Sequence, residues 1–548
     1  MGHPHSKPPL GGAYSRRFTG FTGLFFDEFA TDSAWMRERA TVRLPPLSTG
    51  GAIVIRGEWR ADPEARGIER TLPNLYARFE GSDSVSPAQP IPGPWQVRLQ
   101  APEGAAEEGS TLHFELVGVT ATNALAWAGR MSGLPFLQRF RKQRRNRQLR
   151  ILSIETSEGE LIYDFSRRDS PYSSEFARRH TQLGMNVVGF ITADLGIGES
   201  ARGMIRAADA ASIGLCAVPL KLNCKNRLGD STYSSRLTEG NDQPVNVIHI
   251  DPPAARDIDH HHGKGFREGH YNIGYFAWEL TEFPNAWTGC FDYFDEIWCP
   301  SDFARDAVAA KSPLPVLTMP HSIAFDRPRE SPAALRARFG LPRDGFLFLC
   351  LFDLNSYAER KNPRGAIAAF RQAALPGARL VVKVQNAEAN PSEYEELKAQ
   401  VADLPGALLL TGTYSRSEVY ALEAACDAFV SLHRSEGFGF AVAECMFLGK
   451  PVISTDWSAT REFVNASNGC PVPARLVALE RSHGPYAKGS LWADPDLAAA
   501  AASMRTLASD PGLCARLGAA GQQTIEAHYS PKAIGARYRR RLEAIACF

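Results

Sequence analysis

The chain has no cysteine before Cys216, and its ten cysteines never form a Cys-x-x-Cys pair. Such pairs are the usual sequence sign of a zinc site or a redox-active disulfide. Cys350, Cys426 and Cys445 lie in apolar runs, where a free cysteine behaves as a small hydrophobic residue. We therefore expect a reduced, cytoplasmic protein with no disulfide framework and no structural zinc.

Long apolar runs and net charge are also lacking. No run reaches the roughly 18 apolar residues that a membrane-spanning helix needs, and the first residues lack the apolar segment of a signal peptide. Met1-Gly2 with Ser6 fits a myristoylation pattern, but such short matches are common. The 61 Lys and Arg residues against 60 Asp and Glu residues give a formal net charge of +1. This balance indicates no nucleic-acid partner.

The first 170 residues are predicted to form an antiparallel β-sandwich. Between about residues 25 and 165, apolar and polar residues alternate in short runs separated by Pro/Gly-rich turns. This pattern is typical of strands with one buried face. The region contains no convergent acid–base set, so we interpret it as an accessory domain. Trp59 and Trp95 fall on the apolar faces and are expected in the core, although exposed aromatic rings there would suit a sugar.

A basic segment interrupts this domain at residues 134–150. It carries seven basic residues and no acidic one, with Phe136, Leu137 and Phe140 near its front. The composition predicts a helix on an anionic membrane surface, to which each basic residue contributes about 1 kcal/mol. The alternatives are a solvated helix whose charges pair elsewhere and a nucleic-acid patch.

From Asn186 onwards, strands and helices alternate, which predicts two doubly wound, Rossmann-like parallel-sheet domains. We expect the first in residues 171–335 and the second in residues 336–525, with a C-terminal helix at 526–548. Two such domains in series leave a cleft between the carboxyl ends of their strands, where ligands bind.

The most informative stretch runs from His433 to Met446. An apolar strand leads into a glycine loop that carries Glu436, and a helix that carries Glu444 follows. A glycine loop at a helix start offers unpaired backbone amides to an anion. The two carboxylates instead suit the hydroxyl groups of a sugar or a ribose. The loop residues expected at the ligand are Gly437, Phe438, Gly439 and Phe440.

A second glycine loop, Gly196-x-Gly198-x-x-Ala201, follows the first strand of the first parallel domain. It meets the glycine pattern of a dinucleotide site, but residues 219–223 lack the carboxylate that would hold an NAD ribose. We therefore expect Gly196 and Gly198 to offer backbone amides to a phosphate, without NAD.

Two adjacent cations, Arg360 and Lys361, precede Pro363, which marks a helix start. Cations at a helix N-terminus oppose its dipole and need an anion such as a diphosphate, unless they are simply solvated.

Histidines give two further candidates. His249 ends a predicted strand and is a candidate catalytic contact to the sugar, with a satisfied buried histidine as the alternative. The run His260-His261-His262 is a poor metal site because consecutive side chains diverge.

Together these elements resemble the family-4 (group 1) retaining glycosyltransferases of the two-domain GT-B fold, over about residues 185–545. The most specific part is Glu436-Gly-Phe-Gly-Phe-Ala-Val-Ala-Glu444, followed by Gly-Lys-Pro-Val-Ile-Ser-Thr at 449–455. The resemblance implies that Glu436 and its loop hold the donor sugar, and that Glu444 holds the nucleotide ribose. It also implies a diphosphate on Lys361. The family's arginine lies five residues earlier, where this chain has Ser356, so Arg360 is the expected substitute.

Residues 271–280 and 295–301 look like members that build bacterial surface polysaccharides. The resemblance thus implies a hexosyltransferase that moves a sugar from a nucleotide diphosphate to a glycan or lipid-linked acceptor at the cytoplasmic membrane face. Cations and backbone amides would stabilise the leaving diphosphate, so neither a metal nor a cofactor is expected, and the anomeric configuration would be retained. The alternatives are a phosphorylase or sugar-phosphate synthase of the same fold, and a glycan-binding protein on an inactive transferase scaffold.

Overall fold

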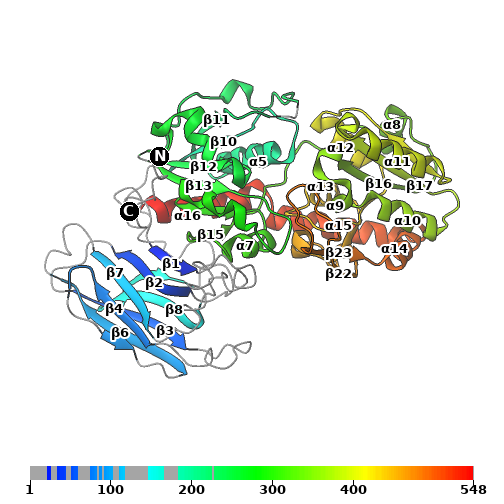
Figure 1. The fold of residues 1–548 in the computed structure, drawn as a ribbon. Coiled ribbons are helices and arrows are strands. Elements are labelled where there is room, and N and C mark those ends of the chain that lie inside the picture. Colours follow the sequence, from blue (N-terminus) through cyan, green and yellow to red (C-terminus); the bar gives the residue numbers. More distant parts are fainter. Residues whose placement is uncertain are drawn as a thin grey trace.

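The structure is a computed structural model. It describes residues 21–25, 34–44, 51–59, 74–82, 86–88, 92–102, 110–117, 146–165, 183–224, 227–268 and 270–546. An antiparallel sheet is followed by two parallel sheets with helices around them (Figure 1). The two predicted Rossmann-like domains and the antiparallel β structure in front of them are confirmed. The β structure was predicted as a sandwich, but its described strands pair into one sheet.

All the described N-terminal strands pair into one sheet, in the order β5-β4-β7-β2-β8-β3-β6, with β1 on β2 and β9 on β8. Strands β5 and β6 at its two ends contact each other, so the sheet curls over its own core. Trp59 is buried in that core and Trp95 is half-buried against it. The strands are β1 (Phe21–Phe25), β2 (Ala34–Leu44), β3 (Ala52–Trp59), β4 (Asn74–Phe79), β5 (Ser86–Ala88), β6 (Gly93–Gln100), β7 (Ser110–Val117), β8 (Asn146–Thr156) and β9 (Leu161–Asp164).

Most of the basic segment predicted to lie on a membrane falls in residues 118–145, outside the described residues. Its last residues, from Asn146, begin strand β8, so the predicted helix does not reach Arg150. Arg150 is instead paired opposite Glu58 of β3. Among the helices that the structure describes, none is long and apolar enough to cross a bilayer.

The first parallel sheet has the order β11-β10-β12-β13-β14-β15. Three buried asparagines form a ladder across its centre: Asn186 donates to Asn246 (2.8 Å), and Asn246 donates to Asn272 (2.9 Å). Because these residues are direct partners in the strand pairing, the ladder fixes the register of three strands. The elements are β10 (Gly184–Gly189), α5 (Gly196–Ala210), β11 (Gly214–Pro219), β12 (Val245–His249), α6 (Ile258–His262), β13 (Tyr271–Tyr275), β14 (Glu296–Cys299), α7 (Asp302–Ala309) and β15 (Val316–Thr318).

The second parallel sheet has the order β18-β17-β16-β19-β20-β21. A two-stranded hairpin that the sequence patterns did not predict, β22–β23, follows it. The elements are α8 (Pro332–Arg338), β16 (Leu347–Asp353), α9 (Ala358–Lys361), α10 (Pro363–Ala373), β17 (Arg379–Gln385), α11 (Pro391–Ala402), β18 (Ala407–Leu410), α12 (Arg416–Ala425), β19 (Ala428–Ser431), α13 (Phe440–Phe447), β20 (Val452–Thr455), β21 (Cys470–Val472), β22 (Ala474–Ala478), β23 (Leu491–Pro495), α14 (Leu497–Ser509) and α15 (Pro511–His528).

The last helix, α16 (Pro531–Ala546), leaves the second domain and packs on α5 of the first (Figure 1). A Cβ on Gly535 would collide with the carbonyl oxygen of Ala207, so the glycine permits this close crossing. Arg541 of α16 forms a buried ion pair with Glu296 of β14, with Arg541 Nε 3.0 Å from Glu296 Oε1. The first domain is thus completed by the end of the described chain.

Candidate active site

Glu436 lies on the loop between β19 and α13, and its side chain is buried. Lys361 Nζ is 2.5 Å from its Oε1, and Arg360 Nη1 is 3.1 Å from its Oε2. Burial alone would raise the pKa of this carboxyl, but the two cations outweigh burial and lower the pKa to about 2. Glu436 is therefore ionised at neutral pH.

Arg360 and Lys361 end the short helix α9 and do not begin α10, as their position before Pro363 had suggested. Asn362, in the left-handed region at φ 53°, separates the two helices and caps α10 by accepting from the Gly365 amide (3.1 Å). The anion that pairs with both cations is a side chain of the protein, Glu436. Burial lowers the pKa of Lys361 even with this carboxylate beside it.

Gly437 and Gly439 allow the loop after Glu436 to pack tightly. The Gly437 carbonyl accepts a hydrogen bond from Ser301 Oγ of the first domain (2.7 Å), and a Cβ on Gly437 would lie 3.1 Å from the Trp278 carbonyl oxygen. Gly439 has φ 99°, and a Cβ there would lie 2.5 Å from Thr460 Cγ2. The loop is therefore held between the two domains.

The two loop phenylalanines are placed by aromatic packing. Phe438 is buried, with its ring 5.6 Å from that of Phe463. The Phe440 ring stacks on His321 of the first domain, with 4.4 Å between ring centres. The Phe438 ring thus belongs to the core.

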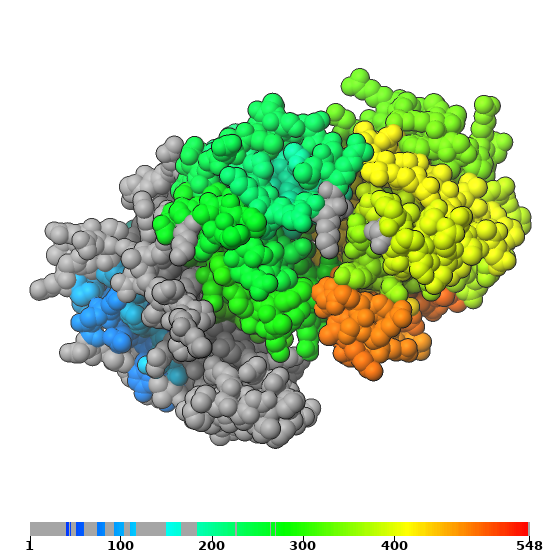
Figure 2. Space-filling view, turned by 45° about the horizontal axis from the view of Figure 1, so that its top comes forward, coloured from blue at the N-terminus to red at the C-terminus, as the bar shows by residue number. Residues whose placement is uncertain are grey.

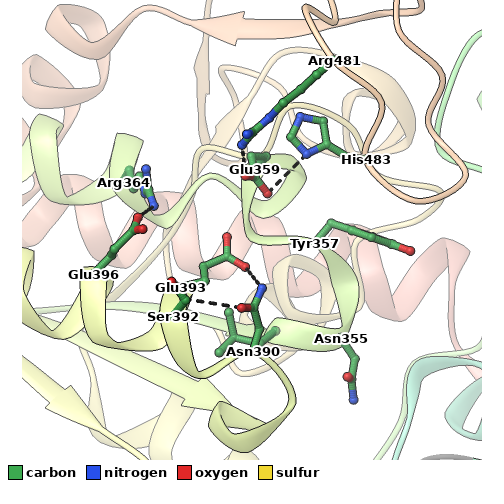
Figure 3. Close-up of a pocket in the computed structure, with 11 residues that line it drawn as sticks. Asn355, Tyr357, Glu359, Arg364, Asn390, Ser392, Glu393, Glu396, Arg481 and His483 are labelled. Atoms are coloured by element: carbon green, nitrogen blue, oxygen red, sulfur yellow. Dashed lines mark hydrogen bonds and ion pairs between the residues drawn. The ribbon is translucent and has the colours of Figure 1, made fainter.

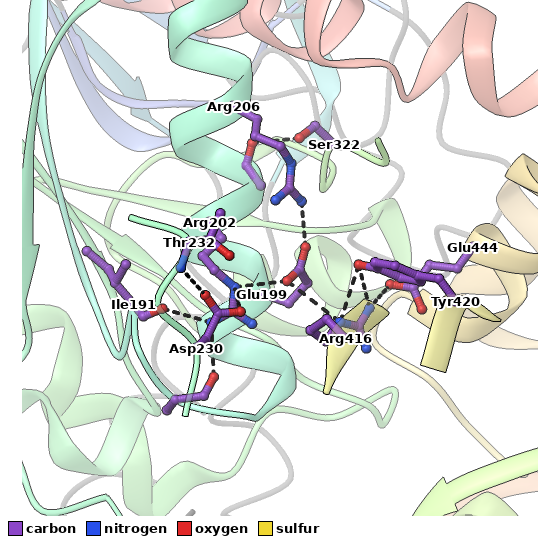
Figure 4. A network of polar contacts seen from close by, with 12 residues as sticks. Ile191, Glu199, Arg202, Arg206, Asp230, Thr232, Ser322, Arg416, Tyr420 and Glu444 are labelled. Atoms are coloured by element: carbon purple, nitrogen blue, oxygen red, sulfur yellow. Dashed lines mark hydrogen bonds and ion pairs between the residues drawn. The ribbon is translucent and has the colours of Figure 1, made fainter. Parts of the chain in front are cut away.

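Glu444 on α13 is buried and paired with Arg416 at the start of α12. Arg416 also lies 3.9 Å from Glu199 of α5, so one arginine bridges carboxylates of both domains (Figure 4). Glu199 in turn pairs with Arg202 (3.0 Å) and Arg206 (2.5 Å). Burial would raise the pKa of Glu199, but its arginines lower it to about 2. Burial raises the pKa of Glu444, although Arg416 opposes this shift.

Sequence reasoning missed Glu199 and Arg416. A carboxylate in the first turn of a helix is a visible signal, because it complements the helix dipole. Nothing local marks Arg416, which follows the ordinary capping box of Ser415 and Glu418.

Gly196 and Gly198 form the first turn of α5 and do not lie in a loop before it. A Cβ on Gly198 would lie 2.7 Å from the carbonyl oxygens of Phe190 and Ala193, so close packing requires glycine there. At Gly196 the space is open. The expected phosphate contact from this turn stays a prediction.

His249 is fully buried in the first domain. Its Nδ1 is 2.8 Å from Ser200 Oγ and its Nε2 is 3.4 Å from Met204 Sδ, so both ring nitrogens have partners. Burial lowers the pKa of His249 well below its usual value. This placement fits the satisfied core histidine and gives no support to a contact with the sugar.

The described residues contain no group of three or more His, Cys, Asp or Glu side chains placed to hold a metal ion. Two Asp-x-Asp sequences occur, Asp257-Ile-Asp259 and Asp494-Pro-Asp496, and structural contacts engage all four carboxylates. Asp257 lies 3.9 Å from Arg256. Asp259 pairs with Arg267 (2.6 Å), Asp494 pairs with Arg434 (3.0 Å), and Asp496 caps α14.

Comparison with known proteins places the second parallel domain in a family. Residues 336–524 match the model of glycosyl transferases group 1. A glycosyltransferase from Rickettsia africae covers 67% of this chain and 99% of its own, at 13% identity and a TM-score of 0.50. HepE from Anabaena, solved in complex with UDP and glucose, covers 65% and 98%, at 14% identity and a TM-score of 0.48. No curated protein matches the sequence. The second parallel domain of this chain is therefore a group 1 glycosyl transferase domain.

Proposed function

We propose that the protein is a retaining glycosyltransferase that moves a sugar from a nucleotide-diphosphate donor to a glycan or lipid-linked acceptor. The observation that carries this proposal is the convergence of Arg360, Lys361 and Glu436 where the two parallel domains meet. The family of residues 336–524 supports it.

The two cations can stabilise the negative charge that develops on the diphosphate during transfer. As the bond between the anomeric carbon and the diphosphate oxygen breaks, its electron pair leaves with the diphosphate. Arg360 is buried and Lys361 is partly buried there, and preorganised charges of this kind stabilise a transition state without reorganisation.

Glu436 changes partners when the donor binds. Once the diphosphate takes over the cations, both carboxylate oxygens are free to accept hydrogen bonds from sugar hydroxyls. The acceptor hydroxyl attacks on the face that the diphosphate leaves, and its proton passes to the departing phosphate oxygen. The configuration at the anomeric carbon is then retained. No step requires a metal or a further cofactor, because the chain's own cations carry the charge.

Glu444 is the proposed partner of the nucleotide ribose. It lies on the same helix that the glycine loop opens, and its present partner, Arg416, is 29% exposed. Arg416 can keep its contact with Glu199 while Glu444 accepts from ribose hydroxyls. Donor binding thus exchanges one interaction of the arginine and does not leave it without a partner.

We also propose that the acceptor belongs to a surface polysaccharide and is met at the cytoplasmic face of the membrane. The support for the membrane is the composition of residues 134–150, and the support for a surface polysaccharide is the resemblance of residues 271–280 and 295–301. Binding of the protein to vesicles that contain phosphatidylserine should weaken with salt and on neutralising Arg141 to Arg147. Vesicle binding that is unaffected by salt and by neutralising these residues would refute the membrane part of the proposal.

The enzymatic proposal is tested by following nucleotide-diphosphate release from a panel of sugar nucleotides. Glu436→Gln should abolish release while the thermal melting curve stays cooperative. Glu330→Gln, an exposed carboxylate far from Glu436 in the sequence, is the matched control and should keep full turnover. Binding of donors without release by the native protein would instead support an inactive, glycan-binding scaffold.

A further inference from the structure

A cavity of about 720 Å³ opens in the second domain, beside helix α9 (Figure 3). It is lined by residues from three segments: 354–364 after strand β16, 390–396 at the start of α11, and 481–483 in the loop of the β22–β23 hairpin. The carboxyl ends of neighbouring parallel strands are where α/β domains bind ligands, and the volume lies in the range of small-molecule sites, about 300–1,000 Å³.

This cavity is separate from the proposed donor site, although both use α9. Glu359 faces the cavity, whereas the next two residues, Arg360 and Lys361, contact Glu436. The hairpin loop covers one side, and the ring of Tyr486, in the same loop, lies 5.8 Å from the Arg360 guanidinium. Figure 2 shows this part of the chain, in orange, at the surface next to the first domain, in green.

The lining is polar, and most of its charges are paired within it. Glu359 pairs with Arg481 (3.1 Å) and lies near His483 (3.6 Å), and Arg364 pairs with Glu396 (2.5 Å). Three carboxylates against two arginines repel phosphate and sulfate groups. Leu354 is the one aliphatic side chain of the lining, so a lipid chain is equally unsuited.

Unlike Glu359 and Glu396, Glu393 forms no ion pair within the described residues. Its Oε2 accepts from the side-chain amide of Asn390 (2.8 Å), whose oxygen accepts from the Glu393 backbone amide (3.4 Å). Among the described residues, no hydrogen bond to its Oε1 is found. Burial and the nearby Glu359 raise the pKa of Glu393. A carboxylate beside an amide is the pair of groups that binds neighbouring hydroxyls, since one accepts and the other also donates.

The wall of the cavity contains strained backbone. Tyr357 has φ 60° without being glycine. The hairpin loop passes so close to its hydroxyl that a Cβ on Gly484, itself at φ 54°, would collide with it. Such a conformation costs about 1–3 kcal/mol and persists where the surroundings impose it, often at ligand sites. Tyr357 also contributes an aromatic ring at the border of the cavity, a surface on which the C–H face of a sugar can pack.

We propose that this cavity is a second carbohydrate site, which binds a neutral sugar unit through Glu393 and Asn390. The site goes beyond the proposed transferase function, because neither the donor nor its diphosphate fits its charge. Its position on the same short helix as Arg360 and Lys361 places a bound glycan chain next to the reaction site.

The test titrates the full-length protein with glucose, N-acetylglucosamine and maltotriose, using saturation-transfer NMR and calorimetry. The native protein should bind at least one of them at millimolar concentrations. Glu393→Ala should weaken that binding about ten-fold, the loss expected when a hydrogen bond to a charged group is removed. Ser392→Trp, which fills the cavity from its rim, should abolish the binding.

Glu395→Ala is the matched control, because Glu395 lies on the same helix, is exposed, and does not line the cavity. Sugar affinity in this variant should equal that of the native protein. Sugar binding that survives Ser392→Trp would overturn the proposal, and so would the absence of binding at tens of millimolar. Nucleotide-diphosphate binding, measured in the same samples, should stay unchanged in all three variants, so a failure here is distinguishable from a failure of the transferase proposal.

Discussion

Lys361 Nζ and Glu436 Oε1 are 2.5 Å apart, so the cation proposed for the diphosphate and the carboxylate proposed for the sugar neutralise each other. Lys361→Ala should reduce the rate of nucleotide-diphosphate release by about 10²–10³, the loss typical when one preorganised group that stabilises the transition state is removed. Initial rates at saturating donor measure this effect. Lys398→Ala, an exposed lysine of α11, should leave the rate unchanged. An equal rate in Lys361→Ala and native protein would refute the assigned role.

Arg416 carries a predicted effect on stability. Arg416→Met removes the partner that Glu444 and Glu199 share, and leaves a buried carboxylate uncompensated. Because Arg416 keeps 29% exposure, we expect a loss of about 2 kcal/mol in the free energy of unfolding, less than for a fully buried pair. Urea unfolding measures it. Arg371→Met, whose ion pair with Asp403 is exposed, should change stability by less than about 0.5 kcal/mol.

Acid should weaken the folded protein through its buried histidines. Burial lowers the pKa of His433 to about 4, from an ordinary value of 6.5. As the pH falls from 6.5 towards 4, His433 binds a proton in the unfolded chain but stays neutral in the folded chain. The free energy of unfolding therefore declines across this window by about 2–3 kcal/mol for this group.

His433→Gln should flatten the dependence of the unfolding free energy on pH between 6.5 and 4. His260→Gln, at an exposed position of α6, should leave the slope as in the native protein. Identical slopes in His433→Gln and native protein would show that His433 takes up its proton with the same pKa in the folded and unfolded chains, and would contradict this prediction.

Gly439 should not tolerate a side chain. Gly439→Ala combines a left-handed backbone with a methyl group 2.5 Å from Thr460 Cγ2, and we expect a loss of about 2–3 kcal/mol. The loop that holds Glu436 would shift, so donor turnover should fall as well. Gly289→Ala, which meets open space, is the comparison and should melt within a few degrees of the native protein. A native melting temperature for Gly439→Ala would contradict this account of the loop.

Local patterns were sufficient wherever burial is continuous along a segment. The strand–helix alternation predicted from Asn186 onwards is found, for example, in the buried strand β14 (Glu296–Cys299) and in the helix α7 that Asp302 begins. The stretch around Glu436 was likewise predicted as strand, loop and helix. In each case the apolar residues that set the element type and the capping residues that set its ends lie within a few positions of one another.

Other features depend on contacts that no local pattern contains. Strand β22 has mostly exposed residues and no clear alternation, so its pairing with β23 was not predicted. Arg416 and Glu199 meet only because the two domains pack together. The same holds for His249, whose partners, Ser200 and Met204, come from a helix that the fold lays beside its strand.

Because α16 follows the second domain in the chain but packs on the first, it determines the order in which the two domains can complete their folding. Ile534, Tyr538 and Leu542 of this helix are buried in the same core as residues of α5 and β10. While the ribosome is still making the second domain, the first has all its strands but lacks the helix that covers α5. Its core closes only after Ala546 has left the ribosome, when the second domain is already complete. The domain that is synthesised earlier is therefore the later one to reach its native state, and it relies on its neighbour to deliver its last helix.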